Sequence, residues 1–387
     1  MPQPRTCLKP KCEIFWTLPV AGWICAAWMG MAACVWGAEV PAGGGDVEGG
    51  GKKLLELAKK KAEVRFWGQV NRAALYADNG TESEWFHVDN DSSPSRFGMA
   101  GDIKPELWKD WAFGGQFELG FKSDNSGEVV FGGPDPEFDV DGRKIEAYVK
   151  SKRFGSLAVG QGDTASNGTA EEDLSGTGVI GYSQVRFAAA SLVFGPATNG
   201  LAVKKVFNNF DGLHRDDRIR YDTPVWHGLT ASVSAAGEEY IDAALRHSKE
   251  FGPHKISSAV ACARKGAGVD QYDGSSSVLL GCGLNFTAAI GGQNVEGETS
   301  PLSCYGKVGW KLDLFPCGST LVAVDYSRNE EVAQADDLAE SYAILLNQRV
   351  DPISSEIYAA VRQYALDREG EDFDDLLVFM SGIKLAF

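Results

Sequence analysis

The sequence has few histidines and lacks the short motifs of common enzymes. Only 5 of its 387 residues are histidine, and no two of them have the i, i+4 spacing of a helical metal-binding pair. No serine stands in a G-x-S-x-G turn, and no glycine-rich phosphate loop precedes a helical pattern. A catalytic triad need not be local in sequence, so a hydrolase built into a β-barrel stays open. The sequence predicts no catalytic residue, no cofactor and no metal site.

Basic charge is also in short supply. Lysine and arginine total 37 against 53 aspartate and glutamate residues, so the formal net charge is -16 at pH 7. Nucleic-acid phosphates bind basic surfaces, and this acidic balance argues against a nucleic-acid partner. It is compatible with an aqueous pore and with an ordinary secreted protein.

Long apolar runs are absent beyond the first forty residues. There, a basic start precedes an uncharged apolar run from Phe15 to Trp36, and the small residues Gly37 and Ala38 follow. This layout predicts an export signal over residues 1–38, with a single membrane anchor as the alternative. No later segment approaches the roughly 18 apolar residues of a membrane-spanning helix. The rest of the chain can therefore lie in a membrane only as strands.

Residues 39–63 separate this leader from the rest of the chain. The range 41–51 is rich in glycine and predicts a linker. The following range, 52–62, is a short basic stretch with apolar residues at helical spacing. We expect no part of the main domain here.

Cysteine is unevenly distributed. Of the 8 cysteines, four lie in the leader, and the others are widely spaced without a C-x-x-C pattern. Exported chains can form disulfides, but the spacing leaves the pairing of these four open. They are Cys262, Cys282, Cys304 and Cys317.

From Val64 onward, apolar and polar residues alternate with a period of two, which places them on opposite faces of β-strands. Clear runs are residues 64–71, 218–221 and 307–314. In each run one face suits lipid and the other suits water, which is typical of a transmembrane β-barrel. A soluble β-sandwich shows the same alternation with the apolar face inward, so this pattern alone leaves both open.

The connections between these runs alternate between short and long. The short ones are residues 105–107, 152–154, 224–226, 252–254 and 316–318. The long polar ones are residues 78–93, 123–141, 162–177, 266–274 and 293–300. Tight turns at one end and long loops at the other are typical of outer-membrane barrels. The pattern predicts roughly 16 to 18 strands and an even number of them.

The final run is aromatic to its last residue. One parity carries Leu377, Phe379, Ile383, Leu385 and Phe387. The other parity carries Leu376, Val378, Met380, Gly382 and Lys384. Such a strand would be a sticky edge in water. It is accounted for if it closes a barrel whose outer face lies in lipid, because closure removes the edge.

Four segments resemble the general trimeric porins of Gram-negative outer membranes. The stretch SRFGMAG at residues 95–101 is similar to a porin second strand, and residues 143–160 and 215–233 are similar to two porin hairpins. The ending at Phe387 is similar to the porin terminal strand. The resemblance covers about Val64 to Phe387. It departs at Ala100, where the porin pattern often has lysine, and in the four cysteines.

The resemblance implies one all-β domain over residues 64–387, a transmembrane antiparallel up-and-down β-barrel with an inward-folded third loop. It implies a homotrimer in the outer membrane that catalyses no reaction and lets ions and small hydrophilic solutes diffuse through a water-filled channel. Its partners would be outer-membrane lipid, these solutes and the barrel assembly machinery, for which Phe387 would be the assembly signal. A substrate-specific outer-membrane channel and an exported β-sandwich with a binding or adhesion role are the alternatives.

The resemblance also implies a pore constriction. Its loop residues would be Asp163, Glu171, Glu172 and Asp173. The basic wall residues expected across from them are Arg96, Arg143, Arg218 and Arg220, of which the last two come from strand parity. Acids that face bases across a narrow aqueous gap create a transverse field that tunes ion selectivity. The alternative is that these are ordinary solvated charges.

Two other groups of residues have plainer explanations. The loop acids Asp135, Glu137, Asp139 and Asp141 could bind calcium, but their spacing does not fit an EF-hand, and an exposed loop is favoured. Several tryptophans lie near strand ends or on outward parity and suit interfacial girdles. They are Trp67, Trp108, Trp111, Trp226 and Trp310.

Overall fold

The computed structural model describes residues 62–106, 108–196, 200–237, 239–266, 268–295 and 300–387. The expected export signal (1–38) and nearly all of the expected linker and basic segment (39–63) lie outside these residues. Within them, strands dominate, as the alternation predicts, and the first strand begins at Ala62, close to the expected Val64.

Seventeen strands occur in the described residues. The first nine are β1 (Ala62–Asp78), β2 (Ser83–Asp89), β3 (Arg96–Ile103), β4 (Trp111–Lys122), β5 (Asp139–Ser151), β6 (Gly155–Asp163), β7 (Arg215–Asp222), β8 (Leu229–Ala236) and β9 (Tyr240–Phe251). The others are β10 (His254–Lys265), β11 (Val269–Leu279), β12 (Leu284–Val295), β13 (Leu302–Phe315), β14 (Gly318–Glu330), β15 (Leu338–Val350), β16 (Ser355–Asp367) and β17 (Leu376–Ala386).

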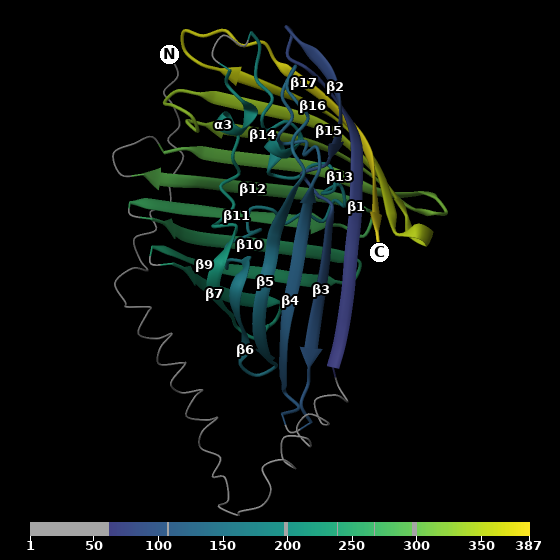
Figure 1. Cartoon of the computed structure of the whole chain (residues 1–387), viewed down its shortest axis with the longest axis vertical. Coiled ribbons are helices and arrows are strands. Elements are labelled where there is room, and N and C mark those ends of the chain that lie inside the picture. Colours follow the sequence, from purple (N-terminus) through teal and green to yellow (C-terminus); the bar gives the residue numbers. More distant parts are fainter. Residues whose placement is uncertain (1–61, 107, 197–199, 238, 267, 296–299) are drawn as a thin grey trace, which may run out of the picture. The chain divides into compact units, whose positions relative to one another are not determined.

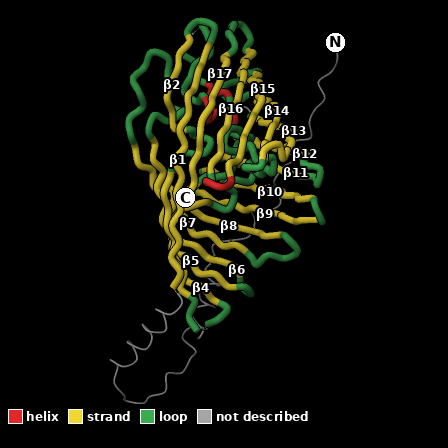
Figure 2. Tube along the Cα trace, turned by 90° about the vertical axis from the view of Figure 1, so that its right-hand side faces the viewer, coloured by secondary structure: helices red, strands yellow, loops and turns green. Residues whose placement is uncertain are grey.

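Helical elements are short in the part of the chain that the structure describes. There they are the 3-10 turns η1 (Val185–Ala188) and η2 (Asp351–Ile353) and the helix α3 (Val203–Val206), drawn in red in Figure 2. No helix of the described ranges has the length and apolar content to cross a membrane.

Each strand pairs antiparallel with its neighbour in the chain, and the first strand closes the ring by pairing with the last. β1 pairs with β17 from Gln69 to Asp78. On its other edge β1 pairs first with β3 and then with β2, so β2 and β3 are two halves of one strand interrupted at residues 90–95. The result is a closed antiparallel barrel of 16 strands, which confirms the predicted class and range. Figure 1 shows β3–β5 crossing β9–β12 at a steep angle, as tilted strands on two sides of a barrel do.

Outward and inward faces follow the predicted parity. Val64 and Phe66 of β1 are 55% and 65% exposed on the outside of the wall, and Ile219 of β7 and Val308 of β13 are also exposed there. Leu385 of the terminal strand lies on the same outer face and is exposed. The strands of the described residues form one sheet with an apolar exterior and no second sheet over it, which is not a two-layer sandwich. The β-sandwich alternative is therefore wrong.

The prediction for Trp67 as an outward girdle residue is wrong. Its ring points inward, and its Nε1 donates to Oε2 of Glu118 on β4 at 3.0 Å. Gly98 on β3 has no side chain, and the Trp67 ring occupies the space that a Cβ would need. The alternation by itself places Trp67 on the inward face with Arg65 and Gln69. The alternation was therefore correct, and the girdle assignment was not.

The connections at the two ends of the barrel differ in length. All five predicted short turns lie at one end, together with residues 280–283 and 351–354. The opposite end carries the long connections 123–138 and 164–214. Two predicted long loops are wrong: residues 78–93 contain strand β2, and residues 266–274 contain the start of β11. Both stretches contain strand residues with polar side chains, which the aqueous lumen admits. In sequence such polar residues resemble a loop, and this explains the wrong prediction.

A large apolar core lies inside the barrel, which the sequence pattern did not predict. The long connection 164–214 contributes Phe194 and Phe207, both at most 1% exposed. They pack in one cluster with the inward residues Leu345 and Leu376 of the wall. Phe207 also meets the ring of Tyr364 on β16, with centroids 5.4 Å apart. The connection is thus packed onto the inner wall of β13–β17 rather than suspended in the lumen.

Replacing Leu345 with alanine should lower the stability of the folded barrel by about 2–5 kcal/mol, because it opens a cavity between the wall and the long connection. Its neighbour Ile344 is 67% exposed on the outer face, whereas Leu345 is 0% exposed. Ile344→Ala should therefore cost less than about 1 kcal/mol. Guanidinium unfolding of both variants in detergent checks the difference, and equal losses would show that the inner core does not stabilise the fold.

Candidate functional site

The long connection 164–214 begins at the end of β6 and returns to the start of β7, which pairs with β6. We call it the inner loop. Its two arms are joined by Asp211, whose Oδ2 accepts from the backbone N–H of Gly168 at 2.7 Å and whose Oδ1 accepts from that of Ala170 at 2.9 Å. Gly168 has a φ of +82°, which a glycine adopts without strain. One carboxylate therefore holds the two arms together at the base of the loop.

Carboxylates and serines of the wall hold the inner loop inside the barrel. Asp242 of β9 accepts from the N–H of Ser166 at 2.7 Å, and Asp273 of β11 accepts from the N–H of Gly212 at 3.1 Å. Further along, Ser275 and Ser277 of β11 accept from backbone N–H groups of the loop, each at 2.9 Å. Backbone donors that leave the sheet need such partners, because a buried N–H without one is costly.

The loop then crosses to the far wall. Asn347 of β15 donates to the carbonyl of Gly176 at 2.9 Å, and Tyr364 of β16 donates to the carbonyl of Val185 at 2.7 Å. The inner loop therefore contacts β9 and β11 near its start and β15 and β16 near its middle.

The structure does not gather the four expected loop acids into one group. Asp163 ends β6, and its carboxylate contacts Lys144 at 2.5 Å and Arg215 at 3.8 Å. Glu172 accepts from the hydroxyl of Ser257 at 2.5 Å. Asp173 pairs with the buried Lys307 of β13 at 2.7 Å.

Glu171 and Glu172 are both partly exposed, and neither forms a salt bridge within the described residues; Glu171 differs in contacting the inner loop itself. The Oε1 of Glu171 accepts from the amide of Asn209 at 3.1 Å.

The four expected wall arginines also divide. Arg218 is buried and donates to Glu146 and to the carbonyls of Asp163 and Gly160. Arg220 pairs with Asp222 at 2.8 Å.

Arg96 and Arg143 keep partly exposed inward positions. Arg143 pairs with Glu118 at 2.7 Å, whereas Arg96 has a contact of 3.5 Å with Gln69.

Two basic residues that the sequence did not suggest join this wall. A shift in the β4–β5 register at Glu118 lets both Arg143 and its neighbour Lys144 form inward ion pairs. Arg215, at the first position of β7, lies within electrostatic range of Arg96. Strand parity cannot predict that Lys144 and Arg215 point inward. A bulge reverses the alternation next to Lys144, and Arg215 stands at a strand end, where the alternation begins.

Charges of the wall and the inner loop meet at one place. Arg96 lies within electrostatic range of Arg143 and Arg215 and of Tyr182 on the loop, and Tyr182 is in turn within range of Glu171. All five side chains are partly exposed. We call these five residues the eyelet. It consists of three arginines on the wall and a carboxyl and a phenol on the loop.

Glu171 has an unusual protonation equilibrium. Burial and the nearby carboxylate of Asp211 raise the pKa of Glu171 well above that of an ordinary glutamate. At neutral pH a protonated Glu171 adds no negative charge to the eyelet.

The comparisons with known proteins agree with this geometry. The family model described as "Gram-negative porin" matches residues 27–377. The chain belongs to the Gram-negative porin family. Among curated protein sequences, none matches significantly.

Several solved porins share the fold. One is the anion-selective porin from Comamonas acidovorans, at 16% identity and a TM-score of 0.58, covering 84% of this chain and 100% of that one. Another is the trimer form of OmpT, an outer membrane protein of Vibrio cholerae, at 13% identity and a TM-score of 0.57, covering 84% and 100%. A third is Salmonella typhi OmpF, at 13% identity and a TM-score of 0.52, covering 85% of this chain and 99% of that one. This chain is thus an outer-membrane porin by family and by fold.

Raising the pH through the elevated pKa of Glu171 should shift the ion selectivity of the porin towards cations. Deprotonation adds one negative charge to the eyelet, and a charge at a constriction is poorly screened. An ordinary glutamate is already ionised above about pH 5.5, so a shift above that value points to Glu171. Reversal potentials in a salt gradient, measured from pH 5.5 to alkaline pH, check this. Glu171→Gln should remove the shift, and an unchanged shift would assign it to another group.

Proposed function

We propose that this porin is a homotrimer that lets ions and small hydrophilic solutes diffuse passively through a water-filled channel, with anions preferred over cations. It catalyses no reaction and uses no cofactor. The eyelet would be the narrow part of the pathway, with Arg96, Arg143 and Arg215 on one side and Glu171 and Tyr182 on the other.

The distribution of ion pairs supports the preference for anions. Arg96, Arg143, Lys144 and Arg215 lie together on the wall, and the carboxylates paired with this group are those of Glu118 and Asp163. Four positive charges against two negative ones leave an excess that attracts anions. Asp173 does not reduce this excess, because it is paired with Lys307. A chain with a net charge of -16 can therefore still contain a basic constriction.

The fold comparison agrees with this preference. The porin from Comamonas acidovorans is described as anion-selective and shares the architecture of this chain. At 16% identity the similarity extends to the fold, so the argument for this chain depends on its own arginines.

A polar cluster on the outer wall supports the trimer. Arg72 of β1 contacts Asp124 at 3.0 Å, His87 of β2 at 2.9 Å and the carbonyl of Ser123 at 2.8 Å. Arg72 and His87 lie on the outward parity of these strands, together with Tyr76 and Trp85, whose rings are in contact with centroids 5.1 Å apart. Charged groups are costly against lipid, so a neighbouring subunit would be a more favourable environment than acyl chains. The similar OmpT is known in a trimer form.

Replacing Arg96 and Arg215 together with glutamine should shift the reversal potential in a salt gradient towards cation preference. The two substitutions remove positive charge from the eyelet, where screening is weak. Single-channel recording of the purified porin in a planar bilayer measures this directly. Arg153→Gln is the matched control, because Arg153 lies exposed in the turn between β5 and β6, away from the constriction.

An equal shift in the control would mean that overall charge, and not the eyelet, sets the selectivity. The absence of conductance from folded wild-type protein would remove the channel function altogether. A current that saturates with one class of solute would instead indicate the substrate-specific channel.

We also propose that the protein is exported by residues 1–38 and that Phe387 is read by the barrel assembly machinery. Phe387 is 70% exposed on the outer face, and its backbone exchanges hydrogen bonds of 2.8 and 3.0 Å with Gly68 of β1. Its ring lies over Gly68, where a Cβ would come within 2.6 Å of it. The residue thus adds one backbone pair and one small ring contact to the closing seam.

Deleting Phe387 should reduce insertion in cells far more than it reduces stability in vitro. The finished barrel loses only these contacts, whereas the assembly machinery would lose its signal. We expect aggregated or degraded protein in cells and normal refolding of the same variant into detergent. Outer-membrane fractionation and heat-dependent migration on gels measure the two properties. Normal insertion in cells would show that Phe387 is dispensable for assembly.

A further inference from the structure

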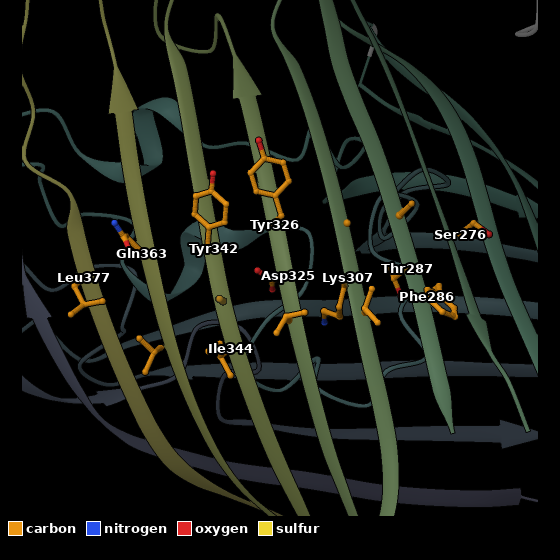
Figure 3. Close-up of a pocket in the computed structure, with 16 residues that line it drawn as sticks. Ser276, Phe286, Thr287, Lys307, Asp325, Tyr326, Tyr342, Ile344, Gln363 and Leu377 are labelled. Atoms are coloured by element: carbon orange, nitrogen blue, oxygen red, sulfur yellow. The ribbon is translucent and has the colours of Figure 1, made fainter. Parts of the chain in front are cut away.

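Lys307 has an unusual position for a lysine of a channel wall. It points inward from the middle of β13, its side chain is 0% exposed, and it does not line the eyelet. In the strand register it lies between Thr287 of β12 and Asp325 of β14, and Figure 3 shows the three residues in this order. A buried ammonium is costly unless all of its donors have partners.

The ammonium group of Lys307 finds these partners on the inner loop. It donates to Oδ2 of Asp173 at 2.7 Å, to the carbonyl of Gly181 at 2.6 Å and to the hydroxyl of Thr177 at 3.1 Å. The hydroxyl of Ser175 lies at 3.4 Å. One ammonium therefore connects both ends of the segment 173–181 to the wall. We call this group of contacts the lysine clasp.

Asp173 is ionised in this arrangement. Burial opposes its ionisation, but the Lys307 ammonium outweighs that effect and holds the pKa of Asp173 below its usual range. One more contact of Asp173 orders the turn, since its Oδ1 accepts from the N–H of Ser175 at 2.8 Å. The carboxylate thus serves the attachment of the loop and not the charge of the eyelet.

The segment held by the clasp connects two eyelet residues. Glu171 precedes Asp173 by two positions, and Tyr182 follows Gly181 directly. At Gly181 the backbone lies close to the wall, because a Cβ there would come 2.9 Å from Leu345 and 3.2 Å from the guanidinium of Arg362. A change in the position of this segment would therefore move the loop side of the eyelet.

Other parts of the inner loop have their own attachments. Asp211, Asp242 and Asp273 hold the base of the loop, and the apolar core holds the later part that includes Phe194 and Phe207. Within the segment 173–181, Ser277, Asn347 and Asn90 bond the backbone of Leu174, Gly176 and Val179. Loss of the clasp would therefore shift the segment at its two ends, next to Glu171 and Tyr182, while the barrel and the rest of the loop stay in place.

We propose that Lys307 is a positioning residue of the channel: its ammonium clasps the segment 173–181 to the β13 wall and thereby sets the width of the eyelet. This inference rests on the proposed channel function. The clasp acts through Glu171 and Tyr182, and Lys307 itself does not contact the solute.

The test compares Lys307→Met, Asp173→Asn and the double variant with wild type in planar bilayers. Lys307→Met keeps the length of the side chain and removes all donors of the clasp, so the open-channel conductance and its current noise should rise. It also removes the cation that lowers the pKa of Asp173, so the unpaired carboxylate should shift the reversal potential towards cations most strongly at alkaline pH, where it is ionised. In the double variant the conductance should stay raised while the reversal potential returns towards wild type, because the unpaired charge is gone.

Asp173→Asn alone should have a smaller effect on conductance, since Lys307 keeps Gly181 and Thr177 as partners. Non-additive effects of the two substitutions would establish their coupling. Lys255→Met is the matched control, because Lys255 is an exposed lysine of β10 that pairs with Glu250. It should leave conductance and noise unchanged. Heat-dependent gel migration verifies that each variant forms the barrel.

Three results separate the possible failures. If wild-type protein does not conduct, the proposed channel function is refuted, whereas the contacts of the lysine clasp are not. If wild-type protein conducts and folded Lys307→Met has the same conductance and noise, the clasp proposal is overturned. If Lys307→Met does not fold, Asp173→Asn decides, and unchanged conductance and noise in that variant would overturn the proposal.

Discussion

A strand in lipid must have partners on both edges, because the hydrocarbon offers none for its backbone N–H and C=O groups. In this chain the pairing of β1 with β17 meets that requirement and makes a closed ring from strands that otherwise pair in chain order. Closure has two consequences for the rest of the molecule. It produces one wall with an apolar exterior, and it encloses an interior that the remaining residues must fill or leave to water.

The interior is divided between these two uses. On the side of β13–β17 the inner loop fills it, and apolar side chains such as Leu345 and Phe207 meet as they would in the core of a soluble protein. On the side of β3–β7 the wall carries Arg96, Arg143 and Arg215, whose charges require water or a carboxylate nearby. The inner loop separates the two regions, since one of its faces packs against apolar wall residues and Tyr182 and Glu171 reach the charged side.

This division explains which features could be predicted from sequence. The outer face contacts lipid everywhere, so the alternation of Val64, Phe66 and Val70 was a sufficient guide, and the strand class and number followed. The inner face has no uniform environment. Met380 is apolar and 1% exposed there because the loop covers it, whereas Lys144 reaches the lumen through a break in the register. Such positions depend on contacts between segments that are far apart in the chain, which a period of two does not contain.

The same reasoning applies to the acids of the inner loop. In sequence, Asp163, Glu171, Glu172 and Asp173 form an acidic group that would favour cations. In the structure two of them form ion pairs with Lys144 and Lys307, and Glu172 is bonded to a serine. For Glu171, burial and the neighbouring carboxylate of Asp211 favour the neutral form. A formal count of loop charges is therefore a poor guide to ion selectivity in this barrel. The negative charge of an ion-paired acid is compensated by its cationic partner, so it attracts a permeating cation only weakly. Arg143 and Arg215 share the carboxylates of Glu118 and Asp163 in the same way. Arg96, whose described contact is with the amide of Gln69, keeps an uncompensated positive charge, because a guanidinium stays protonated in a folded protein.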